Sequence, residues 1–270
     1  MKVFRKGIIK MTDLNSKVEI TLNRIKMFDP LQFSENPYYV AYSGGKDSDV
    51  IRILTNLANV KYDLVHNHTT VDAPETVYYI RTIPEVQISK PRMSMWDLIV
   101  KNKIPPTRLM RYCCKELKER GGKDRIVMTG VRWSESVQRK NRSGLEILKS
   151  KKANTIYLNV DNCESRKMLE NCQIKGKRVL NPIIDWNDEE VWEFLKTHGC
   201  TSNPLYQEGE KRVGCIGCPM AGIKGRERDF IKYPKYKESY IRAFQRMINE
   251  YIYKPTWNTG QEVFDWWMSK

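Results

Sequence analysis

Two groups of residues in this sequence have the types and spacing that chemistry requires. The first is the string Ser43-Gly44-Gly45-Lys46-Asp47-Ser48, which follows an aromatic, β-branched segment at 38–42 and precedes apolar residues at helical spacing. Glycines let backbone N–H groups approach an anion, a helix N-terminus adds a positive dipole, and Lys46 adds a full charge. The Ser43 and Ser48 hydroxyls add donors. The segment predicts a phosphate-binding loop; the alternative is an ordinary glycine turn.

The second group consists of four cysteines. Cys113 and Cys114 are adjacent, and Cys215 and Cys218 form a Cys-x-x-Cys turn. Four thiolates are the number that a [4Fe–4S] cluster or a structural zinc ion needs. Adjacent cysteines chelate one small ion poorly because neighbouring helical side chains diverge, whereas a cubane has separated iron corners. The pattern favours an iron–sulfur cluster, with zinc or an unmetallated site as the alternatives.

A third set of polar residues follows a predicted strand at 125–132. The strand ends near Gly130, and Arg132, Glu135 and Arg139 come next. Ligands of an open α/β sheet bind at the carboxyl ends of its strands. We therefore expect the Arg132 and Arg139 guanidinium groups to bind phosphate or sulfate, the alternative being a solvated basic loop.

Asp72 stands after another predicted strand, at 62–66. Pro74 and the acidic residue after it suit the first turn of a helix. His66 and His68 have strand spacing and no third partner in the sequence, so we interpret them as structural residues rather than metal ligands.

The elements that must position these residues alternate between strand and helix patterns. Such alternation predicts an α/β fold with a doubly wound, mostly parallel sheet.

Asn187, followed by Glu190, predicts a capping box at the start of a helix. Segment 141–152 is rich in Lys, Arg, Ser and Gly, and we expect it to be mobile. Strands are predicted at 38–42, 62–66, 86–90, 125–132, 155–160 and 179–186, and helices at 16–27, 50–57, 93–100, 108–118, 187–199 and 237–251.

The sequence divides into three expected regions. These are an N-terminal helical preface at 1–36, a nucleotide-binding domain with the cysteine site at 37–220, and a helical C-terminal extension packed on it at 221–270. No stretch approaches the apolar length of a membrane span, and the N-terminal residues lack a secretory h-region, so we expect a cytoplasmic protein. Seven cysteines in such a chain argue against a disulfide framework.

The charge balance concerns partners rather than fold. The formal net charge is +15 in 270 residues. Nucleic acid and nucleotides with several phosphates are candidate partners, and a solvated basic surface is the alternative. The sequence is compatible with an oligomer.

The loop at 43–48 resembles the PP-loop of the ATP pyrophosphatase superfamily. It is not a Walker A motif, because the second glycine followed by Lys-Ser or Lys-Thr is missing. Within that superfamily, further motifs are similar to those of adenylyl-sulfate and phosphoadenylyl-sulfate (PAPS) reductases and occur in the same order between about 38 and 220. These motifs are Asp-Ala-Pro-Glu-Thr at 72–76, Gly-x-Arg at 130–132 with Glu135, Ser136 and Arg139, Pro-Ile-x-Asp-Trp at 182–186, Asn-Pro-Leu-Tyr at 203–206 and the Cys-Cys … Cys-x-x-Cys pattern.

The resemblance implies an adenine nucleotide alpha hydrolase-like fold and an adenine nucleotide ligand. That ligand is ATP with Mg²⁺, or adenylyl sulfate or PAPS, and the four cysteines would hold a [4Fe–4S] cluster. Lys46, Arg132 and Arg139 would be the catalytic residues, acting by electrostatic stabilisation. The implied nucleotide-binding residues are Ser43, Gly44, Gly45, Lys46, Asp47, Ser48, Asp72, Gly130, Arg132, Glu135 and Arg139.

The resemblance leaves three functions open. Sulfonucleotide reductases carry a catalytic cysteine near their C-terminus, and here no cysteine follows Cys218. We therefore expect an ATP pyrophosphatase that adenylylates a substrate for sulfur transfer, on nucleic acid, as in the DNA-phosphorothioation ATPase and some tRNA thiolases. The alternatives are a reductase using Cys163, Cys172 or Cys200, and a non-catalytic nucleotide-binding subunit. A sulfur donor protein or thiol reductant would be a further partner.

Overall fold

The computed structural model describes residues 2–33, 35–148, 156–158, 161, 177–250 and 256–270. Its internal contacts divide the chain into two units. Unit 1 comprises Met1–His66, Tyr79–Gln87 and Gly121–Lys211; unit 2 comprises Asn67–Tyr78, Ile88–Arg120 and Arg212–Lys270. The units are interleaved along the chain, whereas the sequence suggested consecutive regions, which stay a prediction.

The central sheet has seven strands in the order β3-β2-β1-β4-β7-β5-β6. Strand β1 pairs in parallel with β2 and β4, and β4 pairs in parallel with β7. Strand β5 pairs antiparallel with β7 and β6. The predicted α/β fold with a mostly parallel sheet is confirmed. The strands are β1 Tyr38–Ala41, β2 Tyr62–Asn67, β3 Val86–Ser89, β4 Ile126–Met128, β5 Leu145–Leu148, β6 Ile156–Leu158 and β7 Lys177–Leu180.

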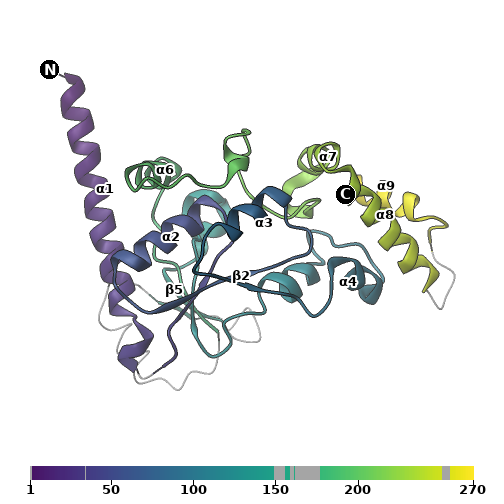
Figure 1. The fold of residues 1–270 in the computed structure, drawn as a ribbon, viewed down its shortest axis with the longest axis horizontal. Coiled ribbons are helices and arrows are strands. Elements are labelled where there is room, and N and C mark those ends of the chain that lie inside the picture. Colours follow the sequence, from purple (N-terminus) through teal and green to yellow (C-terminus); the bar gives the residue numbers. More distant parts are fainter. Residues whose placement is uncertain (1, 34, 149–155, 159–160, 162–176, 251–255) are drawn as a thin grey trace. The chain divides into compact units, whose positions relative to one another are not determined.

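The longer helices carry the names used in Figure 1. None of the helices in the described residues is both long enough and apolar enough to cross a membrane. The helix-rich C-terminal region expected from the sequence is confirmed. The helices are α1 Lys2–Met27, α2 Lys46–Leu57, α3 Pro74–Arg81, α4 Met95–Asn102, α6 Asp188–Thr197, α7 Gly222–Lys232, α8 Pro234–Asn249 and α9 Gly260–Met268.

The core of unit 1 forms where β1 packs against the helices beside it. Tyr38 and Val40 of β1 are fully buried, together with Val50 and Leu54 of α2. Burying each such side chain stabilises the fold by roughly 1.5–3 kcal/mol. The Tyr38 hydroxyl donates to the carbonyl oxygen of Ile25 at 2.9 Å, so α1 is tied to the strand that precedes the phosphate loop.

One sequence expectation about unit 1 is wrong. Part of segment 141–152 is strand β5, whose Leu145 and Ile147 side chains are fully buried. Glu146 on the other face is also buried, where it pairs with Arg142 and accepts from the Asn181 side chain at 3.3 Å. Basic residues surround this strand in the sequence, so its short alternation of apolar and polar residues was not recognised.

Two further expectations meet the structure in different ways. The predicted helix at 108–118 is shorter than expected, because regular helical structure begins at Tyr112 and continues as a π-helical turn at Cys114–Lys118. Cys163 and Cys172 lie outside the described residues.

The core of unit 2 is aromatic. Trp267 of α9 is buried against Phe230 of α7 and against Tyr240 and Phe244 of α8. Its indole N–H donates to the carbonyl oxygen of Pro106 at 2.6 Å, which satisfies the polar atom of a buried tryptophan. Helices α8 and α9 lie side by side in this unit (Figure 1).

Candidate functional site

The phosphate loop connects β1 to α2 within unit 1. Gly44 has a φ of 72°, and Gly45 is the residue before the helix. The Ser48 hydroxyl donates to the Gly45 carbonyl oxygen at 2.7 Å and accepts from its N–H at 3.1 Å. Ser43 remains exposed, with its hydroxyl 3.3 Å from that of Ser48. The predicted strand, glycine turn and helix are therefore formed, and Ser48 holds the turn from inside.

Lys46 lies at a cavity of about 680 Å³ in unit 1. Its ammonium group is 3.1 Å from an Asp188 carboxylate oxygen and 5.3 Å from the centroid of the Trp192 ring. Its backbone N–H donates to the Tyr206 hydroxyl at 3.0 Å. Cavities of about 300–1,000 Å³ commonly hold small molecules. Lys46 thus presents a cation to a space of nucleotide size.

Arg132 joins the loop to helix α6. The buried guanidinium donates to Asp47 at 2.8 Å, to the Ser134 hydroxyl at 2.8 Å and to Asp188. Gly130 lets the backbone before Arg132 lie close to Asp47, since a Cβ at position 130 would lie 2.8 Å from the Asp47 Cβ. We expected Arg132 to bind phosphate or sulfate directly. The structure pairs it with two carboxylates.

The two carboxylates of this network differ in exposure and in pKa. Burial raises the pKa of Asp47, against the opposing charges of Arg132 and Lys46. Burial also acts on Asp188, but hydrogen bonds from Arg132 and Lys46 outweigh it and hold its pKa below the ordinary value. The Asp188 side chain is 65% exposed. Asp188 is therefore the member of the network that a phosphate could displace.

Arg139 forms an ion pair with Glu135, four residues earlier. Glu135 also accepts from the backbone N–H of Arg132 at 3.1 Å. An anion at this position would compete with Glu135 for the Arg139 guanidinium.

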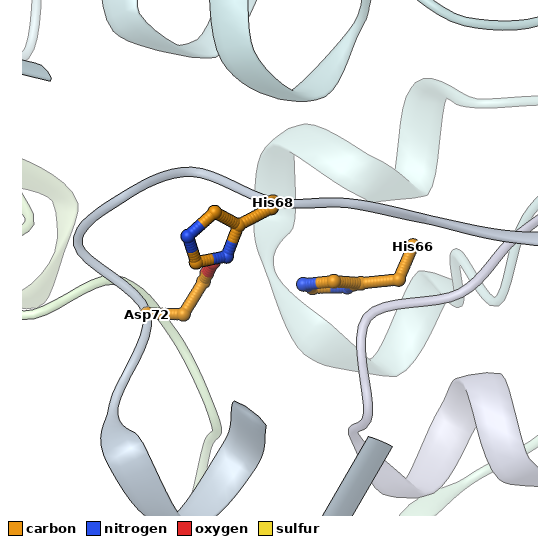
Figure 2. Close-up of side chains that lie close together, drawn as sticks. All are labelled: His66, His68 and Asp72. Atoms are coloured by element: carbon orange, nitrogen blue, oxygen red, sulfur yellow. The ribbon is translucent and has the colours of Figure 1, made fainter. Parts of the chain in front are cut away.

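Asp72, a predicted nucleotide ligand, belongs to unit 2. Its carboxylate accepts from the Thr69 N–H and hydroxyl, each at 2.7 Å, and lies 3.1 Å from the His68 ring (Figure 2). A β-bridge joins Asp72 to Cys215. His66, also drawn in Figure 2, belongs to β2 in unit 1. Its Nδ1 lies 3.0 Å from the Tyr42 carbonyl oxygen. The structure thus gives His68 a carboxylate partner that its sequence position had not suggested.

The Cys215–Cys218 turn is shaped by close packing in unit 2. Gly217 has a φ of 70°, and a Cβ there would lie 2.6 Å from the Phe230 ring. The Gly217 N–H donates to Asp229 at 2.9 Å. Only glycine meets both the left-handed backbone and the crowded surroundings.

The four predicted cysteine ligands lie in unit 2 with free thiols, and they influence one another. A hydrogen bond from Cys113, reinforced by Arg111, lowers the pKa of Cys114 to about 5. The same pairing raises the pKa of Cys113, and the charges of Cys215 and Cys218 add to this rise. The negative charge of Cys215 in turn raises the pKa of Lys118. Cys114 can therefore supply a thiolate beside the cations Arg111 and Lys118, which offset its charge.

Sequence reasoning missed Asp188, Trp192 and Asp49 as site residues. Asp188 follows the predicted cap residue of α6, so its place at a helix start could have drawn attention. Asp49 is fully buried, and it accepts from the hydroxyls of Tyr42 at 2.5 Å and Tyr79 at 3.0 Å. Burial raises its pKa to about 6, although both tyrosine hydrogen bonds oppose the shift.

The Asp49 shift predicts a pH dependence of stability. Below about pH 4 the folded and unfolded chains both carry a protonated Asp49. Between about pH 4 and 6 the unfolded chain releases this proton while the folded chain keeps it, so stability falls as pH rises. We expect Asp49→Asn to abolish this fall. Urea unfolding at pH 4, 5, 6 and 7 should show the variant gaining roughly 3 kcal/mol relative to the unchanged chain across the window. A pH-independent difference would contradict the assignment.

The Lys46–Asp188 contact predicts competition between Asp188 and phosphate. Asp188→Asn should bind pyrophosphate about fivefold more tightly, because one carboxylate no longer occupies the two cations. Calorimetric titration with pyrophosphate in the absence of Mg²⁺ measures this change. Glu189→Gln, one residue away and with the same change of charge, is the control and should leave the affinity unchanged. Unaltered binding by Asp188→Asn would contradict the competition.

Comparisons with known proteins place these features in a family. The model of the phosphoadenosine phosphosulfate reductase domain matches residues 37–221. Uncharacterized protein MJ0066 of Methanocaldococcus jannaschii is 26% identical over 232 residues, covering 80% of this chain and 43% of that protein. An adenosine 5'-phosphosulfate reductase of Bacillus cereus is 25% identical over 211 residues, covering 72% of this chain and 79% of that protein.

A solved structure adds a distant likeness. The phosphoadenylyl-sulfate (PAPS) reductase of Candida auris, as a phosphate complex, has a TM-score of 0.47 at 17% identity, covering 72% of this chain and 93% of that chain. The chain spans less than half the length of the first curated relatives it matches, between 42% and 46%. The family match includes the phosphate loop and both cysteine pairs. The chain therefore belongs to the phosphoadenosine phosphosulfate reductase domain family, with its adenine nucleotide alpha hydrolase-like fold.

Proposed function

We propose that this chain is a PP-loop ATP pyrophosphatase that adenylylates an acceptor for sulfur transfer. The observation that carries the proposal is Lys46, which stands at the start of α2 and lines a cavity of about 680 Å³. The dipole of α2 and the Lys46 ammonium group together suit the β- and γ-phosphates of ATP. Mg²⁺ would enter with the triphosphate and help to neutralise it.

The proposed reaction has two steps. An acceptor oxygen attacks the α-phosphorus of ATP, a new P–O bond forms, and the bond to the β-phosphate oxygen breaks to release pyrophosphate. A sulfur nucleophile then attacks the activated carbon and displaces AMP, which takes the acceptor oxygen with it. Lys46 holds the leaving pyrophosphate, and Arg132 and Arg139 bind anionic groups once their carboxylate partners yield.

The acceptor we propose is a nucleic acid. The net charge of +15 supports a polyanionic partner. A protein or thiol would supply the sulfur.

We further propose that Cys113, Cys114, Cys215 and Cys218 hold a [4Fe–4S] cluster. Four thiolates are the number that such a cluster needs, and the cluster would poise the site electrostatically or transfer electrons.

A reductase acting on adenylyl sulfate or PAPS is the second candidate. Cys200 favours it, because this free cysteine lines the same cavity as Lys46. A thiolate there would attack the sulfur of a bound sulfonucleotide, forming an S–S bond while the bond from that sulfur to the phosphate oxygen breaks and the nucleotide leaves.

Ligand preference separates the two candidates. Anaerobically purified chain, titrated in a calorimeter with Mg-ATP, adenylyl sulfate and PAPS, should bind Mg-ATP most tightly. Lys46→Ala should weaken Mg-ATP binding at least tenfold, because it removes the cation beside the phosphates, and Lys196→Ala on the cavity wall is the charge-matched control. Preference for a sulfonucleotide would overturn the pyrophosphatase and favour the reductase.

Iron content tests the cluster. The unchanged chain should carry about four iron atoms and four acid-labile sulfides after anaerobic purification. Cys215→Ser should lose most of both, whereas Cys200→Ser should keep them, because Cys200 lies in unit 1. Equal iron in the two variants, or zinc in place of iron, would contradict the cluster.

A further inference from the structure

Unit 2 contains a second cavity, of about 280 Å³, which none of the four cysteines lines. It lies between residues 107–109, the residues around the start of α7 and the end of α9. Its walls are largely apolar and aromatic. The lining residues are Thr107, Arg108, Leu109, Pro219, Arg226, Trp266, Trp267 and Lys270.

Every charged residue that lines this cavity is a cation. The Arg226 side chain is only 2% exposed, and it donates to the Trp267 carbonyl oxygen at 2.7 Å. Arg108 donates to the Pro219 carbonyl oxygen at 3.2 Å. In the described part of the chain neither arginine pairs with a carboxylate. Buried charges are normally paired, so this arrangement leaves positive charge available for an anion.

The charges also act on each other. Burial, and then the neighbouring charge of Arg108, lower the pKa of Arg226. The Arg226 guanidinium lies over the Trp267 ring at 5.1 Å from its centroid, which fixes its orientation. An anion near Arg108 would relieve the repulsion between the two cations.

Trp266 indicates that the ligand carries a planar ring as well as a negative charge. Its half-buried ring lies 5.0 Å from that of Trp257 and forms part of the cavity wall. Aromatic side chains beside cations are the usual means of holding single-stranded nucleic acid, because each base has a face to stack and each phosphate a charge. The cavity is smaller than the usual range of about 300–1,000 Å³ for small-molecule sites, so it suits one planar ring rather than a nucleoside triphosphate.

The surroundings favour a strand over a free nucleotide. Segment 101–120, which includes Arg108, carries seven basic residues and two acidic ones. Leu109, at the cavity, is 94% exposed. A backbone leaving the cavity would meet further positive charge along this segment.

We propose that this cavity binds one nucleotide of a single-stranded nucleic acid, with its base against Trp266 and its phosphate beside Arg108. The inference deepens the proposed function, since it rests on a nucleic-acid acceptor and names where that strand is held.

The test is fluorescence anisotropy with labelled 12-nucleotide DNA and RNA strands, without ATP, between 50 and 200 mM salt. Arg108→Ala and Trp266→Ala should each weaken binding about tenfold, and Arg108→Ala should lower the slope against log salt by about one. Trp266→Phe should stay within about threefold of the unchanged chain, because it keeps a stacking face. Arg242→Ala, an exposed charge on α8 outside the cavity, should stay within about twofold.

Thermal melting of each variant shows whether it is folded, and exposed Arg108 provides a test that does not disturb the aromatic core. Equal binding by all variants, or equal losses in Arg108→Ala and Arg242→Ala, would overturn the proposal, as would preference for an acidic peptide over the strand. Because the assay contains no ATP, a failure of pyrophosphate release would be recorded separately.

Discussion

The geometry of the candidate phosphate site depends on a network of two cations and two carboxylates. Lys46 contacts Asp188, Asp188 contacts Arg132, and Arg132 contacts Asp47 in the first turn of α2. Charges removed from water cost several kcal/mol each unless they are paired, so the two carboxylates offset the cost of burying Lys46 and Arg132. Asp188 is the most exposed member, so the contacts that hold the loop in place include one carboxylate that is open to solvent.

Unit 2 holds a second group of reactive side chains, which are cysteine thiols. The Cys215–Cys218 turn is held by the Gly217 contacts and by the bridge to Asp72, so the fold fixes the backbone that carries these two thiols. Lys118 supplies positive charge for them. Asp72 lies shortly after β2 in the sequence. The bridge therefore joins the segment that follows β2 to the cysteine turn.

Local sequence patterns predicted the local features well. The capping box of Asn187 and Glu190 forms as expected, with the cap accepting from the Glu190 N–H at 2.9 Å, and the glycine turn joins the predicted strand and helix. Each depends on residues within a few positions of one another. Strand β5 was missed because only two buried apolar residues, Leu145 and Ile147, mark it among many charges.

The pairing of distant residues was beyond such patterns. Arg132 lies 85 positions from Asp47 and 56 from Asp188, so nothing local could show that carboxylates would surround it. The cysteine pairs could be grouped only by counting ligands and by resemblance. The pH-sensitive Asp49 gave no signal, since its two tyrosine partners become neighbours only in the fold.

The central claim is that the phosphate loop cleaves ATP between its α- and β-phosphates. The most direct measurement incubates the anaerobically purified chain with Mg-ATP labelled at the α-phosphate, with and without single-stranded DNA or tRNA and a sulfide donor, and identifies the labelled product. The account predicts labelled AMP together with unlabelled pyrophosphate, formed faster when the nucleic acid is present. Labelled ADP with inorganic phosphate, or the absence of turnover under every condition, would contradict it.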